Sequence, residues 1–288
     1  IVRSFLHRFD TTGLPSVNDA VLKDLCVKEG ERRGYDLDAL RPAMTVGLNI
    51  TAAAYHHLSN VKVKVFIVFY TTFVTYLDDV YPDDPDALVG VNNFTKHFSA
   101  SEKHSNKMLD DLANLLAETS QLFGQVPADL IVHAGLKFIL GLVLERKNED
   151  ESVSVKFDMY ALYLRELSGL GEAYAMFIFP AEVPDNIYIQ ALPIIRDFIC
   201  FTNDITSFYK EECEGETHNL VSFLAEARGE PKNKALYYLV EKCMEAHERI
   251  LLILSPHQEA QGMFKEFVKG FLSFHLGGKR YRLDELNL

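Results

Sequence analysis

Two groups of oxygen-bearing side chains in this sequence could bind a divalent cation. The first is the segment Asp78-Asp79-Val80-Tyr81-Pro82-Asp83-Asp84, which places four carboxylates within seven residues. Like charges that close together repel by on the order of several kcal/mol, and a bound cation would compensate them. The segment contains no His or Cys, and hard oxygen ligands favour Mg²⁺ or Mn²⁺ over zinc and copper. Taken alone, the segment is also compatible with a solvated acidic loop.

The second group is formed by Asn203, Ser207 and Glu211, which follow one another at intervals of four residues. On a helix this spacing aligns an amide, a hydroxyl and a carboxylate along one stripe, so all three can offer oxygen to one cation. A polar stripe alone is also typical of a solvated helix face. Because both oxygen-rich groups follow apolar helical segments, chance becomes a weaker explanation for the occurrence of the two patterns.

The elements that carry these groups are predicted to be helices. Apolar residues recur every three to four positions in the stretch from Val65 to Leu77, where Tyr70, Val74 and Asp78 share one face. Pro82 is expected to end this helix, which places Asp78 at its C-terminus. The residues before Asn203 predict a largely buried helix, namely Leu192, Ile194, Ile195, Phe198, Ile199 and Phe201.

Helical periodicity dominates the rest of the chain, and no long or low-complexity linker interrupts it. Breaks at Gly and Pro residues divide the sequence into segments of ordinary helix length. We therefore predict an all-α fold with a single domain over residues 1–288. The polar run Lys147–Ser152 is interpreted as a solvated loop between helices.

Composition restricts the class of function. The net charge of -12 argues against a nucleic-acid partner, and four cysteines without metal-ligand spacing indicate reduced thiols rather than disulfides or zinc. The most apolar stretch is too short to span a membrane and residues 1–5 show no secretory leader, so a cytoplasmic protein is expected. The histidines, His275 among them, lack ligand spacing and are interpreted as structural.

These motifs together resemble those of the class I terpene synthases, and within that class the fungal trichodiene synthase group. The resemblance rests on Asn203 to Glu211 with Lys210 before the Glu, on Tyr163-Leu164-Arg165-Glu166-Leu167-Ser168-Gly169-Leu170-Gly171, and on Arg280-Tyr281-Arg282-Leu283. It covers residues 60 to 285. It implies a helical bundle around a central apolar cavity, a three-magnesium cluster and a role in fungal secondary metabolism.

The resemblance also implies roles for individual residues. Metal ligands would be Asp78, Asn203, Ser207 and Glu211, with Mn²⁺ as an alternative to Mg²⁺. Arg165 would sense the diphosphate of a prenyl diphosphate substrate, and Lys210, Arg280 and Tyr281 would contact it. A helix break at Gly169 and Gly171, which would otherwise be a simple kink, would face the reacting carbon. Tyr70, Val74, Phe271 and Phe274 would line the apolar pocket.

One departure from the pattern concerns the acidic pairs. Three residues separate Asp79 from Asp83, where the trichodiene-type motif has two. We therefore expect smaller roles for Asp83 and Asp84 than for Asp78.

The activity implied by the resemblance is cyclisation, because the second aspartate-rich motif of chain-elongating prenyltransferases is absent. The expected substrate is farnesyl diphosphate, converted through a bisabolyl-type cation to a sesquiterpene. A monoterpene or diterpene cyclase and a catalytically silent helical scaffold remain alternatives. The oligomeric state is left open, a homodimer included.

Overall fold

The computed structural model describes residues 1–82, 84, 86, 89–151 and 153–286. Across these residues the chain forms helices and no strand, as the periodicity predicts. The α-helices are α1 (Val2–Leu6), α2 (Ala20–Arg33), α3 (Arg41–Ala54), α4 (Val61–Val80), α5 (Phe94–Ala100), α6 (Lys107–Ala117), α7 (Gln125–Asp150), α8 (Asp158–Ser168), α9 (Gly171–Met176), α10 (Leu192–Glu214), α11 (Leu220–Arg228), α12 (Lys232–Leu254) and α13 (Gln258–Gly277). Short 3₁₀-helices lie between them: η2 (Val91–Asn93), η3 (Thr119–Gln121), η4 (Asp185–Ile187), η5 (Ile189–Ala191), η6 (Lys279–Tyr281) and η7 (Leu283–Leu286).

Local side-chain chemistry sets several helix ends. In the described part of the chain, four helices start at a residue whose side-chain oxygen accepts from the first-turn backbone N–H groups, namely Asp19, Asn60, Asn106 and Asn219. Three helices end at glycines in the left-handed conformation, Gly34, Gly215 and Gly229. The predicted stop of α4 is confirmed, since the helix ends at Val80, two residues before Pro82.

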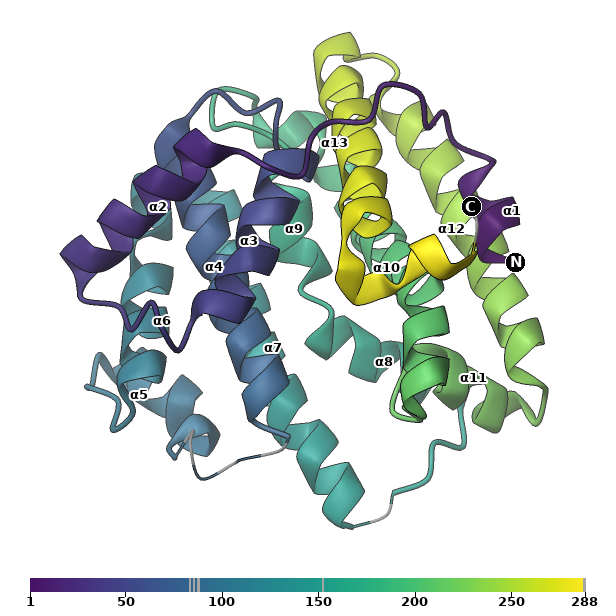
Figure 1. The fold of residues 1–288 in the computed structure, drawn as a ribbon, viewed down its shortest axis with the longest axis horizontal. Coiled ribbons are helices and arrows are strands. Elements are labelled where there is room, and N and C mark those ends of the chain that lie inside the picture. Colours follow the sequence, from purple (N-terminus) through teal and green to yellow (C-terminus); the bar gives the residue numbers. More distant parts are fainter. Residues whose placement is uncertain (83, 85, 87–88, 152, 287–288) are drawn as a thin grey trace.

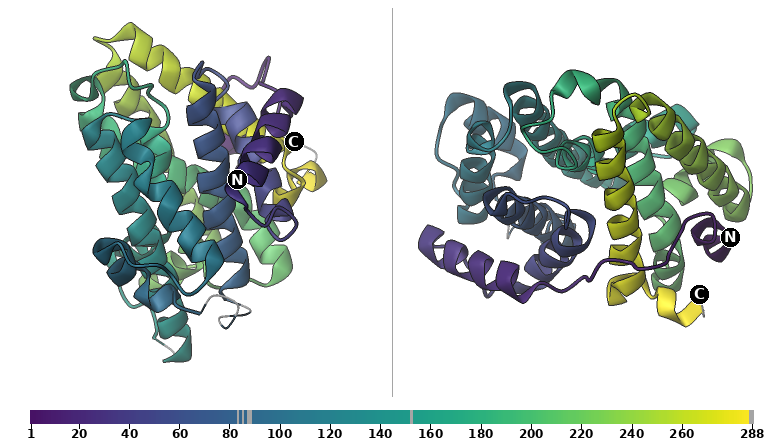
Figure 2. Two further views of the ribbon diagram at one scale, coloured as in Figure 1. Left: turned by 90° about the vertical axis from the view of Figure 1, so that its left-hand side faces the viewer. Right: turned by 90° about the horizontal axis from the view of Figure 1, so that it is seen from above.

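The helices form a bundle whose packing contacts run in a closed circuit. In order, α13 packs on α3, α3 on α4, α4 on α7, α7 on α9, α9 on α10, and α10 on η6, which returns to α13. Figure 1 shows that α4 and α10 both have their C-terminal ends at the lower side of the bundle. Figure 2 gives the same bundle from the side and from above. Asp78 and the stripe from Asn203 to Glu211 therefore lie at one end of the fold.

A very close crossing joins α13 to α3. A Cβ atom on Gly270 would lie 2.0 Å from the carbonyl oxygen of Ala53, a distance that only a glycine permits. The crossing holds Phe271, the next residue, in the buried interior of the bundle.

The two ends of the chain lie side by side. The Arg3 guanidinium donates to the Leu286 carbonyl at 2.7 Å, and residues 7–19 then cross over the bundle to α2 (Figure 1). The Ser273 hydroxyl on α13 donates to the carbonyl of Pro15 at 2.7 Å and so attaches the segment of residues 7–19 to the bundle.

Helix α7 differs from the sequence prediction in two respects. The prediction of a loop at Lys147–Ser152 is wrong for residues 147 to 150, which continue the helix, because no Gly or Pro interrupts it there. The segment Gln125–Asn148 is also long and apolar enough to cross a membrane by length and composition. Half of its most apolar window is buried inside the protein, where α7 packs against α8 and α9. A core helix passes the same test, and we interpret α7 as one.

Candidate active site

The first half of the site is the C-terminal end of α4. Tyr70 and Val74 are buried on the face that points into the bundle, and Asp78 follows one turn later at an exposed position. Desolvation by the surrounding protein raises the pKa of Asp78, while the charges of Arg280 and Arg165 lower it. The carboxylate of Asp78 is thus reachable by solvent and lies within the field of both arginines.

The second half is the predicted stripe on α10. Ser207 is 6% exposed, and among the described residues its Oγ finds no hydrogen-bond partner of acceptable geometry. It nevertheless lies near enough to the Glu211 carboxylate to lower the pKa of that group. Burial acts in the opposite direction and dominates, so the pKa of Glu211 is raised to about 7. The stripe therefore contains a hydroxyl without a well-formed hydrogen bond and a carboxyl group whose charged form is destabilised by burial.

Arg165, on α8, joins the stripe directly. Its Nε lies 2.8 Å from one carboxylate oxygen of Asp204, and its Nη2 donates to Asn203 Oδ1 at 3.1 Å. Burial opposes the positive charge, but Asp204 outweighs it and raises the pKa of Arg165. The neighbouring Glu166 pairs with Lys137 and Arg196.

The predicted helix break lies just after Arg165, between α8 and α9. The residue in the left-handed conformation is Leu170, with φ 53°, rather than a glycine. Gly169 and Gly171 serve close approach instead, because a Cβ on either would come within 3 Å of Cys200 Sγ on α10. A buried non-glycine residue at positive φ stores strain, which is typical of functional sites.

Arg280, in the C-terminal segment, bridges to the α4 end of the site. The Arg280 guanidinium pairs with Asp79 at 3.1 Å, next to Asp78. Tyr281 is buried, and its hydroxyl accepts from Asn203 Nδ2 at 3.4 Å. Residues 280 and 281 thus link the end of α4 to the stripe on α10.

Lys210 lies at the outer end of the stripe. Its ammonium group pairs with Glu214 at 3.3 Å and with Glu216 at 3.8 Å. The charge of Glu216 also raises the pKa of Asp78 and of Glu211, so it acts on both halves of the site.

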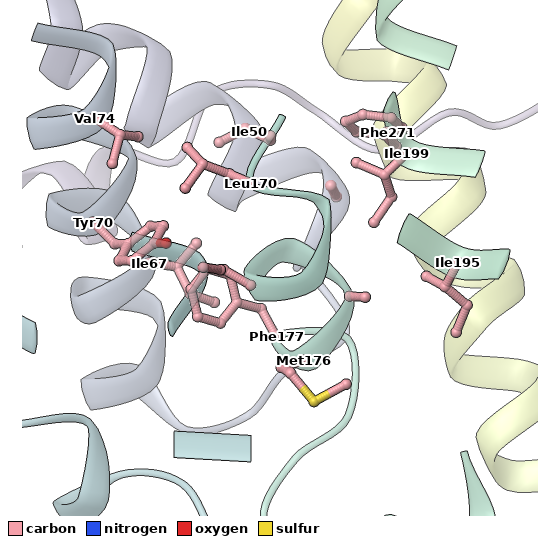
Figure 3. Close-up of a cluster of buried hydrophobic side chains, with 14 of the residues drawn as sticks. Ile50, Ile67, Tyr70, Val74, Leu170, Met176, Phe177, Ile195, Ile199 and Phe271 are labelled. Atoms are coloured by element: carbon pink, nitrogen blue, oxygen red, sulfur yellow. The ribbon is translucent and has the colours of Figure 1, made fainter. Parts of the chain in front are cut away.

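Apolar side chains from several helices converge next to these charged groups. Figure 3 shows Tyr70 and Val74 from α4 on one side and Ile199 and Phe271 from α10 and α13 on the other, with Leu170 between them. The cluster also includes Ile50, Ile67, Met176, Phe177 and Ile195. Phe274 is buried beside it, 6.5 Å from the Phe271 ring and 5.6 Å from Tyr281. Gly169 contacts Cys200 rather than the centre of this cluster.

The residues present fit a hard divalent cation. Asp78, Asn203, Ser207 and Glu211 offer carboxylate, amide and hydroxyl oxygens, which magnesium prefers. A cation would satisfy the unpartnered Ser207 Oγ and would offset the desolvation that raises the pKa of Glu211. Within the described part of the chain no cluster of three or more His, Cys, Asp or Glu residues could hold a metal, so such a site depends on Asn203 and Ser207.

Hollows at the surface do not define this site. One of about 330 Å³ is lined by residues from the two chain ends and from the other face of α10, such as Val2, Phe208 and Leu286. Another of about 300 Å³ lies between α8 and α10, and Arg165 is among its lining residues. We locate the site by its charged groups, because the larger hollow contains none of the predicted site residues.

Sequence reasoning brought together most of the site but missed three residues. Asp204 stands inside the motif without an assigned role, yet it is the partner of Arg165. Glu216 follows the helix end at Gly215, so helical spacing could not place it. His275 was interpreted as structural, and its Nε2 lies 3.5 Å from Asn203 Nδ2. Asp83 lies outside the described residues, and Asp84 is exposed.

Comparisons with known proteins identify similar sequences and a similar fold. Residues 40–287 match the sequence model of the family described as trichodiene synthase (TRI5), which starts 20 residues before the motif resemblance. Alpha-cuprenene synthase COP6 of Coprinopsis cinerea is 34% identical over 99% of this chain and 89% of its own length. Monoterpene synthase 25 of Postia placenta is 28% identical over 99% and 86%. Linalool/nerolidol synthase from Streptomyces clavuligerus, solved with 2-fluorogeranyl diphosphate, superposes with a TM-score of 0.71 at 15% identity, over 94% of this chain and 99% of its own.

Proposed function

The chain belongs to the trichodiene synthase family, and from this premise we propose that it converts farnesyl diphosphate to a cyclic sesquiterpene in a magnesium-dependent reaction. Its fold is that of the class I terpene synthases, and it is a terpene cyclase. The observation that carries the proposal is the state of the α10 stripe. Among the described residues, Ser207 Oγ is buried without a hydrogen bond of acceptable geometry, and burial raises the pKa of Glu211 to about 7, a combination that a bound cation would relieve.

In this proposal the charged groups bind the diphosphate of the substrate. Asp78 on α4 and Asn203, Ser207 and Glu211 on α10 would hold magnesium, which when bound neutralises the leaving diphosphate. Arg165 offers a planar guanidinium fork suited to phosphate oxygens, and Lys210 offers a point charge. Arg280 and Tyr281 approach from the C-terminal segment.

Ionisation then needs no protein nucleophile. As the carbon–oxygen bond breaks, the electron pair leaves with the diphosphate and an allylic cation remains beside the apolar cluster. Charges preorganised around the diphosphate stabilise that separation more than they stabilise the intact substrate. Arg165 needs little reorientation to stabilise the diphosphate, because Asp204 and Asn203 already fix the position of its guanidinium group.

The apolar cluster protects and shapes the cation. Tyr70, Phe177 and Phe271 offer aromatic faces whose quadrupoles tolerate positive charge, and the surrounding aliphatic side chains exclude water. Burial raises the pKa of Tyr70 well above its usual range, so its hydroxyl keeps its proton and is not a base. We propose that the released diphosphate takes the proton that ends the reaction.

Two chain lengths of the prenyl diphosphate substrate have support from the comparisons. The family and the similarity to alpha-cuprenene synthase support farnesyl diphosphate and a bisabolyl-type route. The similarity to a monoterpene synthase favours geranyl diphosphate as the second candidate.

Incubation with each prenyl diphosphate tests the proposal. Purified protein would receive geranyl, farnesyl or geranylgeranyl diphosphate with Mg²⁺, and extracts would be analysed by gas chromatography and mass spectrometry. A cyclic sesquiterpene from the farnesyl substrate alone supports the proposal. A product from the geranyl or geranylgeranyl substrate alone would show that the substrate has that chain length instead. If none of the three substrates gave a terpene, the enzymatic function would be refuted.

A further inference from the structure

A wholly buried histidine contacts the first residue of the predicted metal-binding stripe on α10. His275 lies on α13 with 0% exposure, and three aromatic rings enclose it. The rings of Phe271 and Tyr281 lie 4.5 Å from it and that of Phe274 lies 5.1 Å away. A buried imidazole nitrogen that lacks a hydrogen-bond partner costs free energy, so the contacts of both ring nitrogens matter.

The partner of the first nitrogen fixes the tautomer. Nδ1 lies 2.7 Å from the carbonyl oxygen of Phe271, one turn earlier on the same helix. A carbonyl can only accept, so Nδ1 carries the hydrogen and donates it. A neutral imidazole carries one ring hydrogen, so with Nδ1 as the donor the Nε2 atom has a lone pair that accepts.

The second nitrogen meets the Asn203 side chain. Nε2 lies 3.5 Å from Asn203 Nδ2, and the same amide nitrogen lies 3.4 Å from the Tyr281 hydroxyl. On the other side of the amide, Arg165 donates to Asn203 Oδ1 at 3.1 Å. The two amide hydrogens thus face two acceptors, while the amide oxygen faces a donor.

These contacts form a chain of hydrogen bonds with one direction. It runs from Arg165 to the amide oxygen of Asn203, from the amide nitrogen to His275, and from His275 to the Phe271 carbonyl. If the amide turned over, its NH₂ group would face the Arg165 guanidinium and its oxygen would face the lone pair of Nε2. Both contacts would be repulsive.

We propose that His275, together with the Tyr281 hydroxyl, is a positioning residue that keeps Oδ1 of Asn203, rather than Nδ2, turned toward the metal–diphosphate site. Only the oxygen of an amide can bind a divalent cation. The proposal rests on the function proposed above, because it requires Asn203 to be a metal ligand. It gives His275, near the C-terminal end of α13, a role in the orientation of the Asn203 side chain.

Three substitutions at position 275 separate this role from simple packing. In His275→Gln, the side-chain oxygen reaches the place of Nε2 and can still accept from Asn203. In His275→Asn, the shorter amide can replace Nδ1 as donor to Phe271 but does not reach Asn203. His275→Phe fills the space and does neither. We would titrate Mn²⁺ in the presence of inorganic diphosphate by electron paramagnetic resonance, and record thermal unfolding of each metal-free protein.

Loss of a partner that orients a ligand weakens metal affinity by about 10- to 100-fold. We expect a loss of that size in His275→Asn and His275→Phe, and retention of affinity within about threefold in His275→Gln. The kinetic counterpart is a fall in kcat that Gln rescues and Asn does not. Equal losses in Gln and Asn, or wild-type affinity in all variants, would overturn the proposal.

A second background keeps the test decisive if a variant is less stable. An aspartate at position 203 presents oxygen in either orientation, so its alignment no longer depends on His275. In the Asn203→Asp protein, His275→Asn should therefore leave Mn²⁺ affinity unchanged, and a further loss equal to that in the wild-type background would count against the proposal. Absence of Mn²⁺ binding by the wild-type protein would instead refute the proposed function itself.

Discussion

Glu211 allows a prediction in which the loss of a catalytic group makes the folded protein more stable. Burial raises the pKa of this carboxyl from 4.5 to about 7. The folded protein therefore binds its proton more tightly than the unfolded chain does. The contribution of Glu211 to stability falls as pH rises from 4.5 to 7, and above that range the full penalty is present.

The size of the effect follows from the shift. A change of this size in pKa corresponds to about 3 kcal/mol, and because Glu211 is partly exposed we reduce this to about 1–2 kcal/mol. Glu211→Gln keeps the shape and removes the charge. At pH 8 in the presence of a chelator, we expect the variant to unfold about 4 °C above the wild type. The difference should shrink toward pH 5, where the wild-type carboxyl is protonated.

Differential scanning fluorimetry across this pH range measures the effect. Glu226→Gln, the same change at an exposed helical position, is the matched control and should not move the unfolding temperature by more than about 1 °C. Magnesium with diphosphate should stabilise the wild type and not Glu211→Gln. If Glu211→Gln unfolds below the wild type at pH 8 in chelator, the argument that burial strains this carboxyl is refuted.

Three further predictions concern single residues. Asp78→Asn should lower kcat/KM by about 100-fold, whereas Asp84→Asn, at an exposed position, should lower it by no more than about fivefold; equal losses would contradict this ranking. Gly270→Ala should lower the free energy of unfolding in urea by about 3 kcal/mol, because its Cβ would meet the Ala53 carbonyl. Gly262→Ala lies on the same helix with open space around it and should raise that free energy by about 0.5–1 kcal/mol. Arg165→Lys should lower kcat by about 100-fold, because an ammonium group cannot replace the fork that bonds Asp204 and Asn203; full activity would show that the fork is not required.

The helical architecture could be predicted from the sequence because its signals are local. The period of three to four residues, the stop at Pro82 and the stripe from Asn203 to Glu211 all depend on neighbours along one helix. The same local reasoning failed at residues 147–150, where polar residues continue α7 without a breaker. Polarity alone does not end a helix.

The contacts between helices could not be predicted in this way. The pairing of Arg165 with Asp204 joins residues 39 positions apart, and that of Arg280 with Asp79 joins residues 201 apart. The contact between His275 on α13 and Asn203 on α10 joins residues 72 positions apart. Leu170 was missed as the point of the helix break because glycines on both sides are the expected carriers of positive φ.

The most direct test of the account compares the wild type with the double substitution Asn203→Ala and Ser207→Ala. The measurement is the rate of diphosphate release from farnesyl diphosphate, with Mg²⁺ and with a chelator. We predict that release by the wild type requires Mg²⁺, and that the double variant retains less than about 1% of the wild-type rate while its helical circular dichroism is unchanged. Release at the wild-type rate by the double variant, or wild-type release that is unaffected by the chelator, would contradict the assignment of the α10 stripe as the metal site.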